Sequence, residues 1–295
     1  KKGLFEEDVT PGVFNSVEEL EKDFVFNKYC ASNLSKYLVK VTREIEIKKS
    51  TTRMNNTMAK QRDPNAEDAP IPSEVALVFL KPNDTYSFTQ LLKENRITRD
   101  DVYAIGVPCQ DTLDGGDACD SCAGKKSVSC DEYIGIDENT VVGNSNRLEV
   151  LEKFEKMTAD ERHEFWKNEF SRCIRCNACR NVCPACTCEK CVFDNNNLYT
   201  TQKVAETNFE ESLFHIVRAW HVAGRCTDCG ECSRVCPQEI PLYLLNRKYI
   251  KDINELYGDY QAGSDMETKP PMLTFTTDDC EASIVWDRSK DGGNE

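Results

Sequence analysis

Cysteine is the residue type whose spacing suggests chemistry, and it forms two matching runs. The first run is Cys173-x2-Cys176-x2-Cys179-x3-Cys183-Pro184, and 53 residues later it recurs as Cys226-x2-Cys229-x2-Cys232-x3-Cys236-Pro237. Three thiolates within seven residues can hold three corners of one 4Fe–4S cubane. In two-cluster ferredoxins the fourth cysteine of each run ligates the other cluster. The spacing therefore predicts two crossed ligand sets, Cys173, Cys176, Cys179 with Cys236, and Cys226, Cys229, Cys232 with Cys183.

Zinc and disulfides are the competing interpretations of these runs. Structural zinc sites usually pair two CxxC knuckles or use histidine, and the chain has only three histidines. The 17 cysteines are an odd number, so they cannot all pair internally, and nothing in the sequence indicates secretion. The repeated run favours iron–sulfur clusters over both alternatives.

Nine cysteines lie outside the two runs. Cys109, Cys119, Cys122 and Cys130 fall within 22 residues of a Gly- and Asp-rich stretch, which predicts a third 4Fe–4S cluster; a zinc site or reduced loop thiols are the alternatives. Three more follow the first run directly and could either ligate a fourth cluster or line the surroundings of the first: Cys186, Cys188 and Cys191. Cys30 and Cys280 are isolated, as small buried apolar residues often are.

Charged and imidazole side chains accompany the runs. Arg172 and Arg225 each precede the first cysteine of a run, so they could offset the negative charge of a cluster. The three histidines, His163, His215 and His221, all fall on the helical stretches before the runs. We expect them to pack or to hydrogen-bond a cluster loop rather than to ligate metal.

Composition narrows the classes of function. The 295 residues carry 37 Lys plus Arg against 51 Asp plus Glu, a formal net charge of −14, which argues against general nucleic-acid binding and suits docking to a protein partner. No apolar run approaches the ~20 residues of a membrane-spanning helix, and no signal peptide is present. We therefore expect no membrane span and a cytoplasmic protein. Neither a nucleophile–base signature nor an HExxH-type metal motif occurs, so we assign no catalytic residue.

The elements that must position these cysteines predict an α+β fold in three parts. Residues 1–150 form an N-terminal α/β domain with a cysteine-rich loop, in which strands at Val75–Leu80 and Val102–Val107 flank a helix over Thr85–Asn95. Residues 151–260 form an α-helical two-cluster domain, and 261–295 an extended tail that docks on a partner. A capping box at Thr158–Glu161 predicts a helix start, and further helices are expected over 212–223 and 241–258. Residues 48–74 are polar and contain three prolines, which predicts a long surface loop.

Two resemblances follow from these motifs. The 42-residue, partly helical connection between Cys183 and Cys226 resembles the α-helical ferredoxin domain of fumarate reductase iron–sulfur subunits and of the heterodisulfide reductase small subunit. Four stretches together resemble the beta-subunit family of deazaflavin-coenzyme-reducing hydrogenases and formate dehydrogenases: Val75–Pro82, Val102–Asp111, Glu161–Cys191 and His215–Leu242.

The second resemblance implies an electron-transfer subunit in a cytosolic redox complex of an anaerobe. Such a subunit passes electrons between a catalytic partner (a hydrogenase, a formate dehydrogenase or a heterodisulfide reductase-like subunit) and a flavoprotein. Some family members hold FAD, so the alternative is a flavin- or deazaflavin-binding beta subunit that itself reduces the coenzyme. Asn83-Asp84 stands where many relatives have Cys-Asp, and no GxGxxG loop is present.

Overall fold

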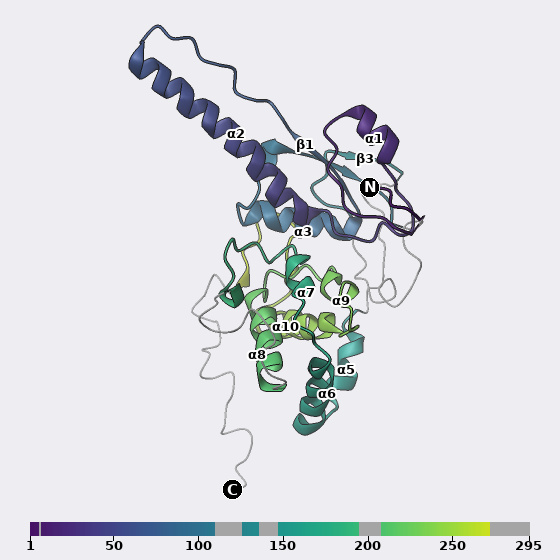
Figure 1. Ribbon diagram of the computed structural model, residues 1–295. Helices are drawn as coiled ribbons and strands as arrows, with labels where there is room; N and C mark the ends of the chain where they lie inside the picture. Colours follow the sequence, from purple (N-terminus) through teal and green to yellow (C-terminus); the bar gives the residue numbers. More distant parts are fainter. Residues whose placement is uncertain (6, 110–125, 136–146, 195–207, 272–295) are drawn as a thin grey trace.

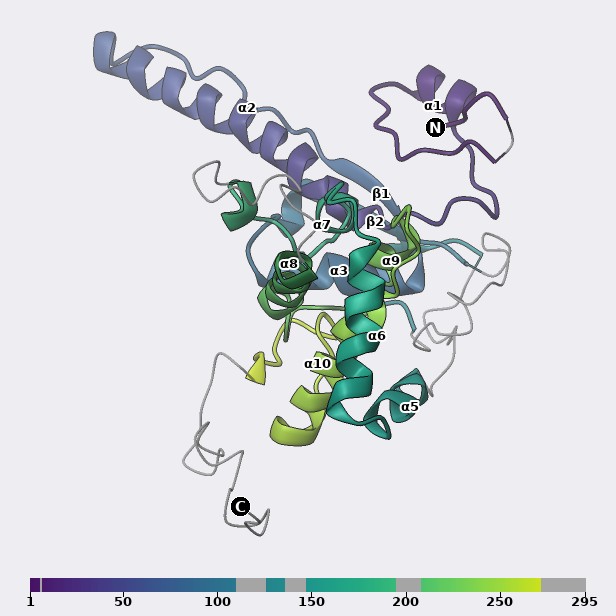
Figure 2. The ribbon, with the colours of Figure 1, turned by 60° about the horizontal axis from the view of Figure 1, so that its bottom comes forward.

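The computed structural model describes residues 1–5, 7–109, 126–135, 147–194 and 208–271 (Figure 1). Within these ranges the protein combines helices with one small parallel sheet, which confirms a mixed α and β architecture. The sheet and the long helix α2 form one part of the molecule, and the cysteine runs lie among helices in the other part (Figures 1 and 2). None of the described helices is long and apolar enough to cross a membrane.

The sheet is built on the two predicted strands. Strand β1 (Ala76–Leu80) pairs in parallel with β2 (Val102–Gly106), in the register Ala76↔Val102 to Leu80↔Gly106, and the short β3 (Glu132–Tyr133) extends the sheet on the other side of β2. A short helical turn, η1 (Arg99–Asp101), leads into β2. Apolar side chains of the strands form the core with α3 (Pro82–Lys93) and the start of α2. The predicted strand–helix–strand unit is therefore confirmed.

Helix α3 lies between the sheet and the cysteine-bearing helices (Figures 1 and 2). It begins at a proline, which suits the first helical position because that residue needs no amide hydrogen-bond partner. Most of its residues are buried, including polar Thr85, Ser87 and Thr89, which a surface helix would expose. Burial on both sides follows from its position between two packed layers.

The predicted loop over residues 48–74 is wrong in its first half. Helix α2 (Ser35–Arg62) runs through it, and only afterwards does the chain return without regular structure to β1. The prolines begin at Pro64, so nothing before them interrupts a helix. The far half of α2 projects beyond the sheet (Figure 1), where hydrogen bonds such as Asn56 Nδ2 to the Ala69 carbonyl oxygen, 2.9 Å, hold the returning segment. Before α2 lies the short helix α1 (Val17–Asp23), and residues 24–34 separate the two helices.

The helical part contains two short helices, each of which carries the third cysteine of a run, packed among longer ones. The short helices are α7 (Ala178–Asn181) and α9 (Glu231–Arg234); the longer ones are α6 (Ala159–Ser171), α8 (Asn208–His221) and α10 (Leu242–Tyr257). The predicted capping box at the start of α6 is confirmed, since the Thr158 and Glu161 side chains each bond the other's backbone amide. Short turns η2 (Glu149–Leu151), α5 (Glu152–Glu155) and η3 (Val192–Asp194) complete this part.

The chain beyond α10 packs on the body before it leaves the described residues. Tyr260 and Ala262 are buried. Gly263 lies so close to the Tyr86 backbone that a Cβ at position 263 would clash with the Tyr86 carbonyl oxygen. The φ of Gly263, +74°, also favours glycine. The beginning of the expected tail is therefore packed rather than extended, while residues 272–295 lie outside the described ranges.

Candidate metal centre

Both cysteine runs share one backbone conformation, repeated at the same 53-residue offset as the cysteines. Arg175 and Asn177 have φ of 54° and 61° just before α7, and their counterparts Asp228 and Gly230 have φ of 59° and 75° just before α9. These left-handed residues turn the chain around the sulfurs between the first and third cysteines. The Arg175 amide donates to Cys173 Sγ at 3.4 Å. The repeat is therefore structural as well as sequential.

The first predicted ligand set surrounds one cavity. Cys173, Cys176 and Cys179 line it together with Cys236, which comes from the second run. The cavity encloses about 330 Å³ of empty space, part of which opens to solvent. Its apolar wall includes Phe214 of α8, Ile240 and Leu242, the first residue of α10. Cys176 is exposed, so this site lies near the surface.

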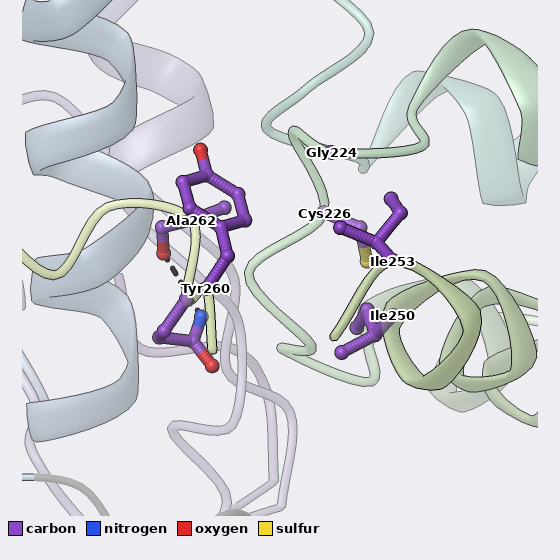
Figure 3. Close-up of a pocket in the computed structure, with 7 residues that line it drawn as sticks. Gly224, Cys226, Ile250, Ile253, Tyr260 and Ala262 are labelled. Carbon is purple, nitrogen blue, oxygen red and sulfur yellow. Dashed lines mark hydrogen bonds between the residues drawn. The ribbon is translucent and has the colours of Figure 1, made fainter. Parts of the chain in front are cut away.

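The second predicted ligand set is also brought together. The charge of Cys183 acts on each of the other three thiols, Cys226, Cys229 and Cys232, which means that the fourth cysteine of the first run lies beside the second. Asn246 of α10 donates from Nδ2 to Cys232 Sγ at 3.4 Å. Cys226 also lines a small cavity with Ile250, Ile253 and the Tyr260–Ala262 segment (Figure 3).

Burial keeps most of these thiols protonated when no metal is bound. It raises the pKa of Cys173 to about 11 and the pKa values of Cys179 and Cys226 to about 12. Cys183 differs, because a hydrogen bond from the Cys186 thiol lowers its pKa to about 6. Metal ligation requires the thiolate, so binding of iron at these sites must release protons.

A buried ion pair fixes each left-handed turn, but with opposite polarity. Arg175 donates from Nε to Glu211 of α8 at 3.0 Å, and the Arg175 guanidinium also lies over the Phe214 ring. At the equivalent position of the second run Asp228 accepts from Arg247 Nε of α10 at 2.9 and 3.0 Å, and from Arg147 at 3.3 Å. Each turn is thus tied to the following long helix by charge.

His215 lies beside the first set without a polar partner among the described residues. Its ring stacks on Phe170 at 4.6 Å, and burial lowers its pKa to about 3, so the imidazole is neutral. Its ring nitrogen, Cys173 Sγ and a Glu211 oxygen lie within 4.8 Å of one another. Because Glu211 already pairs with Arg175, we interpret His215 as a packed wall of the cavity, as expected from the sequence.

The two arginines expected to offset cluster charge are paired with carboxylates instead. Arg172 is bound to Glu169 on the surface, and Arg225 donates from Nε to Glu94, the residue directly after α3, at 2.8 Å. A third arginine that the sequence did not single out, Arg218 of α8, is buried beside cysteines of both runs. None of its three guanidinium nitrogens has a hydrogen-bond partner within the described ranges. An unpaired cation amid thiols fits a site built for anionic clusters.

The second run also joins the two parts of the molecule. Thr227 Oγ1 lies 2.8 Å from Ser87 Oγ of α3, the Asn33 amide donates to Glu231 at 3.2 Å, and Arg225 binds Glu94. The second ligand set therefore lies at the interface with the sheet domain, whereas the first lies toward solvent.

The remaining cysteines are only partly placed. Cys109 lies just beyond the carboxyl end of β2, whereas Cys130 lies just before the amino end of the parallel strand β3, beside Gly106 of β2. Cys119 and Cys122 fall outside the described residues. Burial raises the pKa of Cys130 to about 11. Cys186 lies beside Cys183, and Lys36 of α2 donates to the Cys186 carbonyl oxygen. The third and fourth cluster sites stay predictions.

Several residues that shape the site carried no recognisable signal in the sequence. The buried charges Glu211, Arg218 and Arg247 come from helices whose cysteine-facing sides are known only once they pack. Arg175 and Asp228 occupy equivalent places between cysteines, and this equivalence could have indicated matching roles in the two runs. Their left-handed conformation was not predictable from residue type.

Comparison with known proteins identifies the helical part. Residues 169–240 match the family model of 4Fe–4S dicluster domains. The F420-dependent formate dehydrogenase subunit beta of Methanocaldococcus jannaschii is 32% identical over 132 residues, 43% of this chain and 33% of the relative. The F420-dependent formate dehydrogenase 1 subunit beta of Methanococcus maripaludis is 30% identical over 131 residues, with the same coverage. The chain spans about a third of the length of these curated relatives. It carries a 4Fe–4S dicluster domain, and its resemblance to formate dehydrogenase beta subunits is confirmed over the matched part.

Proposed function

We propose that the chain is an iron–sulfur electron-transfer subunit of a cytoplasmic oxidoreductase complex in an anaerobe. It relays electrons between a catalytic subunit of the hydrogenase, formate dehydrogenase or heterodisulfide reductase kind and a flavoprotein. A 4Fe–4S cluster, when bound, accepts and donates single electrons. The observation that carries the proposal is the exchange of one thiol between the two runs, which gathers two sets of four cysteines.

In this proposal each set of four cysteines holds a different cluster. Cys173, Cys176, Cys179 and Cys236 hold the first cluster near the surface, where the exposed Cys176 suits exchange with a partner protein. Cys226, Cys229, Cys232 and Cys183 hold the second cluster against α3. A third cluster on Cys109, Cys119, Cys122 and Cys130 would continue the relay at the edge of the sheet.

The crossed assignment is tested by a pair of matched variants, Cys183→Ser and Cys236→Ser, purified anaerobically. Wild-type two-cluster domains hold about eight iron atoms, and each variant is expected to lose about four of them. The signal lost on Cys183→Ser should be the one that also disappears on Cys229→Ser, and the signal lost on Cys236→Ser the one that disappears on Cys176→Ser. If Cys183→Ser instead removes the same electron paramagnetic resonance signal as Cys176→Ser, each run ligates its own cluster. A colourless protein containing zinc and no iron would exclude an electron relay altogether.

A flavin- or deazaflavin-dependent coenzyme reduction is the second candidate, because both relatives are named F420-dependent. The sheet offers the carboxyl ends of β1 and β2, where parallel sheets commonly bind ligands. At these strand ends, however, the first turn of α3 is buried. The Asp84 carboxylate in that turn forms an ion pair with the Lys81 ammonium at 2.7 Å. Denaturing the anaerobically purified protein and measuring released flavin separates the two candidates, since the relay alone requires none.

A further inference from the structure

Arg218 is the largest of the fully buried side chains in the described residues, and neither the relay nor the ion pairs explain its burial. It is 2% exposed, on the face of α8 that packs toward the cysteines. The nearest acidic residue on the same face, Glu211, lies two turns earlier and is bound to Arg175. Isolated burial of a guanidinium, which does not lose its proton in proteins, is strongly unfavourable unless an anion compensates for it. Some other group must therefore supply the missing negative charge.

The groups around Arg218 are sulfurs from both ligand sets. Cys179 belongs to the first set, Cys183 and Cys232 to the second, and Cys186 lies beside Cys183. Burial alone disfavours the charge of Arg218, and the thiolate form of these cysteines, which is the form that ligates metal, supplies the negative charge that offsets it. His215, which also feels the charge of Arg218, is neutral and adds no charge. Arg218 thus faces both sites and no carboxylate binds it in the described part of the chain.

We propose that Arg218 is the shared counterion of the two clusters, and that its single positive charge raises the reduction potential of both. This inference rests on the proposed function, because it requires two clusters at these cysteines. Each thiolate-bound 4Fe–4S cluster gains negative charge when it is reduced, so a nearby cation stabilises the reduced form and makes the potential less negative. A guanidinium has five N–H donors in a fixed plane, and can therefore address sulfur atoms on two sides at once.

The position between the sites distinguishes Arg218 from a residue that serves one cluster only. Its electrostatic partners include Cys232 of the second set and Cys179 of the first. Removal of its charge should therefore shift two potentials together. An ordinary hydrogen-bond donor to one sulfur, such as Asn246 at Cys232, should shift one potential when it is replaced.

The test is an anaerobic redox titration of the full chain, followed by electron paramagnetic resonance. Arg218→Gln keeps much of the shape and removes the charge, and both potentials should move to more negative values. Arg218→Lys keeps the charge, and its potentials should lie closer to those of the wild type. The matched control is Arg172→Gln, an arginine next to Cys173 in sequence whose side chain is 45% exposed and bound to Glu169. It should leave both potentials unchanged.

The outcomes separate this inference from the proposed function. Unchanged potentials in Arg218→Gln, or an equal shift in Arg218→Lys, would overturn the counterion role while leaving the two-cluster relay intact. A shift of one potential alone would make Arg218 a partner of one cluster, which also overturns the shared role. If Arg218→Gln takes up no clusters and Arg218→Lys does, the positive charge is needed to hold them, as proposed. If neither variant takes up clusters, shape rather than charge is required and the inference fails. Absence of clusters from the wild type would refute the proposed function itself.

Discussion

Asp228→Asn tests whether buried charge, rather than cysteine spacing alone, holds the second cluster loop. The Asp228 side chain is 1% exposed, accepts two hydrogen bonds from Arg247 at 2.9 and 3.0 Å, and a third from Arg147 at 3.3 Å. Loss of the carboxylate charge leaves two guanidinium groups with no compensating anion. Removal of one partner from a buried ion pair typically costs about 3–5 kcal/mol. Asparagine adopts the left-handed backbone as readily as aspartate does, so the turn itself should not add to this cost.

We expect the lower end of that range, about 3 kcal/mol, because both arginines keep neutral partners. Arg147 still binds Gln261 at 2.8 Å, and Arg247 still donates to the Arg147 carbonyl oxygen at 3.2 Å. For a domain of this size such a loss lowers the midpoint of thermal unfolding by on the order of 10 °C. The assay is anaerobic unfolding in urea and by heat, with loss of the visible cluster absorption and of helical signal recorded in parallel.

A matched substitution on α10, the helix that carries Arg247, provides the control. Asp252→Asn also removes one aspartate charge, but Asp252 is paired on the surface of α10 with Lys248, and exposed pairs contribute at most about 1 kcal/mol. A loss of less than about 1 kcal/mol in Asp228→Asn, equal to the loss in this control, would refute the reasoning. It would mean that the cysteines and their metal fix the loop without help from the ion pairs.

Two other perturbations follow from the same geometry. Phe170→Ala removes a fully buried ring that stacks on His215, and such truncations lower the free energy of unfolding by about 3–5 kcal/mol. Urea unfolding of the cluster-loaded protein measures this loss, and a near-neutral effect would contradict the packing. Burial raises the pKa of Cys173 to about 11 and the pKa values of Cys179 and Cys226 to about 12, above the ordinary value of 9.0, so the unfolded metal-free chain loses these thiol protons first. The stability of the metal-free chain should therefore be fully present below pH 9 and fall as the pH rises from 9 toward 12, measured as the urea midpoint at pH 8 and pH 10; an unchanged midpoint would count against buried thiols.

Local sequence patterns predicted the elements whose signals are local. Alternation of apolar runs and prolines located β1, β2 and the helix between them within a few residues, and the Thr158–Glu161 pair fixed the start of α6. The cysteine runs predicted the dicluster domain because a cubane imposes its own spacing on the chain. Residues 48–62, the last fifteen of α2, differ from the predicted loop because their polar composition is compatible with an exposed helix and no proline precedes Pro64.

The charges around the cysteines could not be predicted in the same way. Glu211 and Arg218 stand on one helix with exposed Phe209 and Trp220, and the sequence does not state which face turns inward. The face that carries Glu211 and Arg218 turns inward because the groups that interact with these charges, Arg175 and the thiols, lie on that side. Arg172 and Arg225, which directly precede the cysteine runs, were the more obvious candidates for offsetting the charge of a cluster. Arg172 is instead paired with Glu169, and Arg225 with Glu94.

The opposite polarity of the two turns has a consequence for the history of the repeat. A duplicated segment can be overwritten by its copy through recombination, and cysteines at equal spacing would survive such an exchange. Arg175 and Asp228 would not, because a copy of the first run placed at the second would set an arginine against Arg247 and Arg147, and the reverse exchange would set an aspartate against Glu211. Like charges buried together are strongly unfavourable. The two half-domains share a backbone, but their inherited sequences are no longer interchangeable.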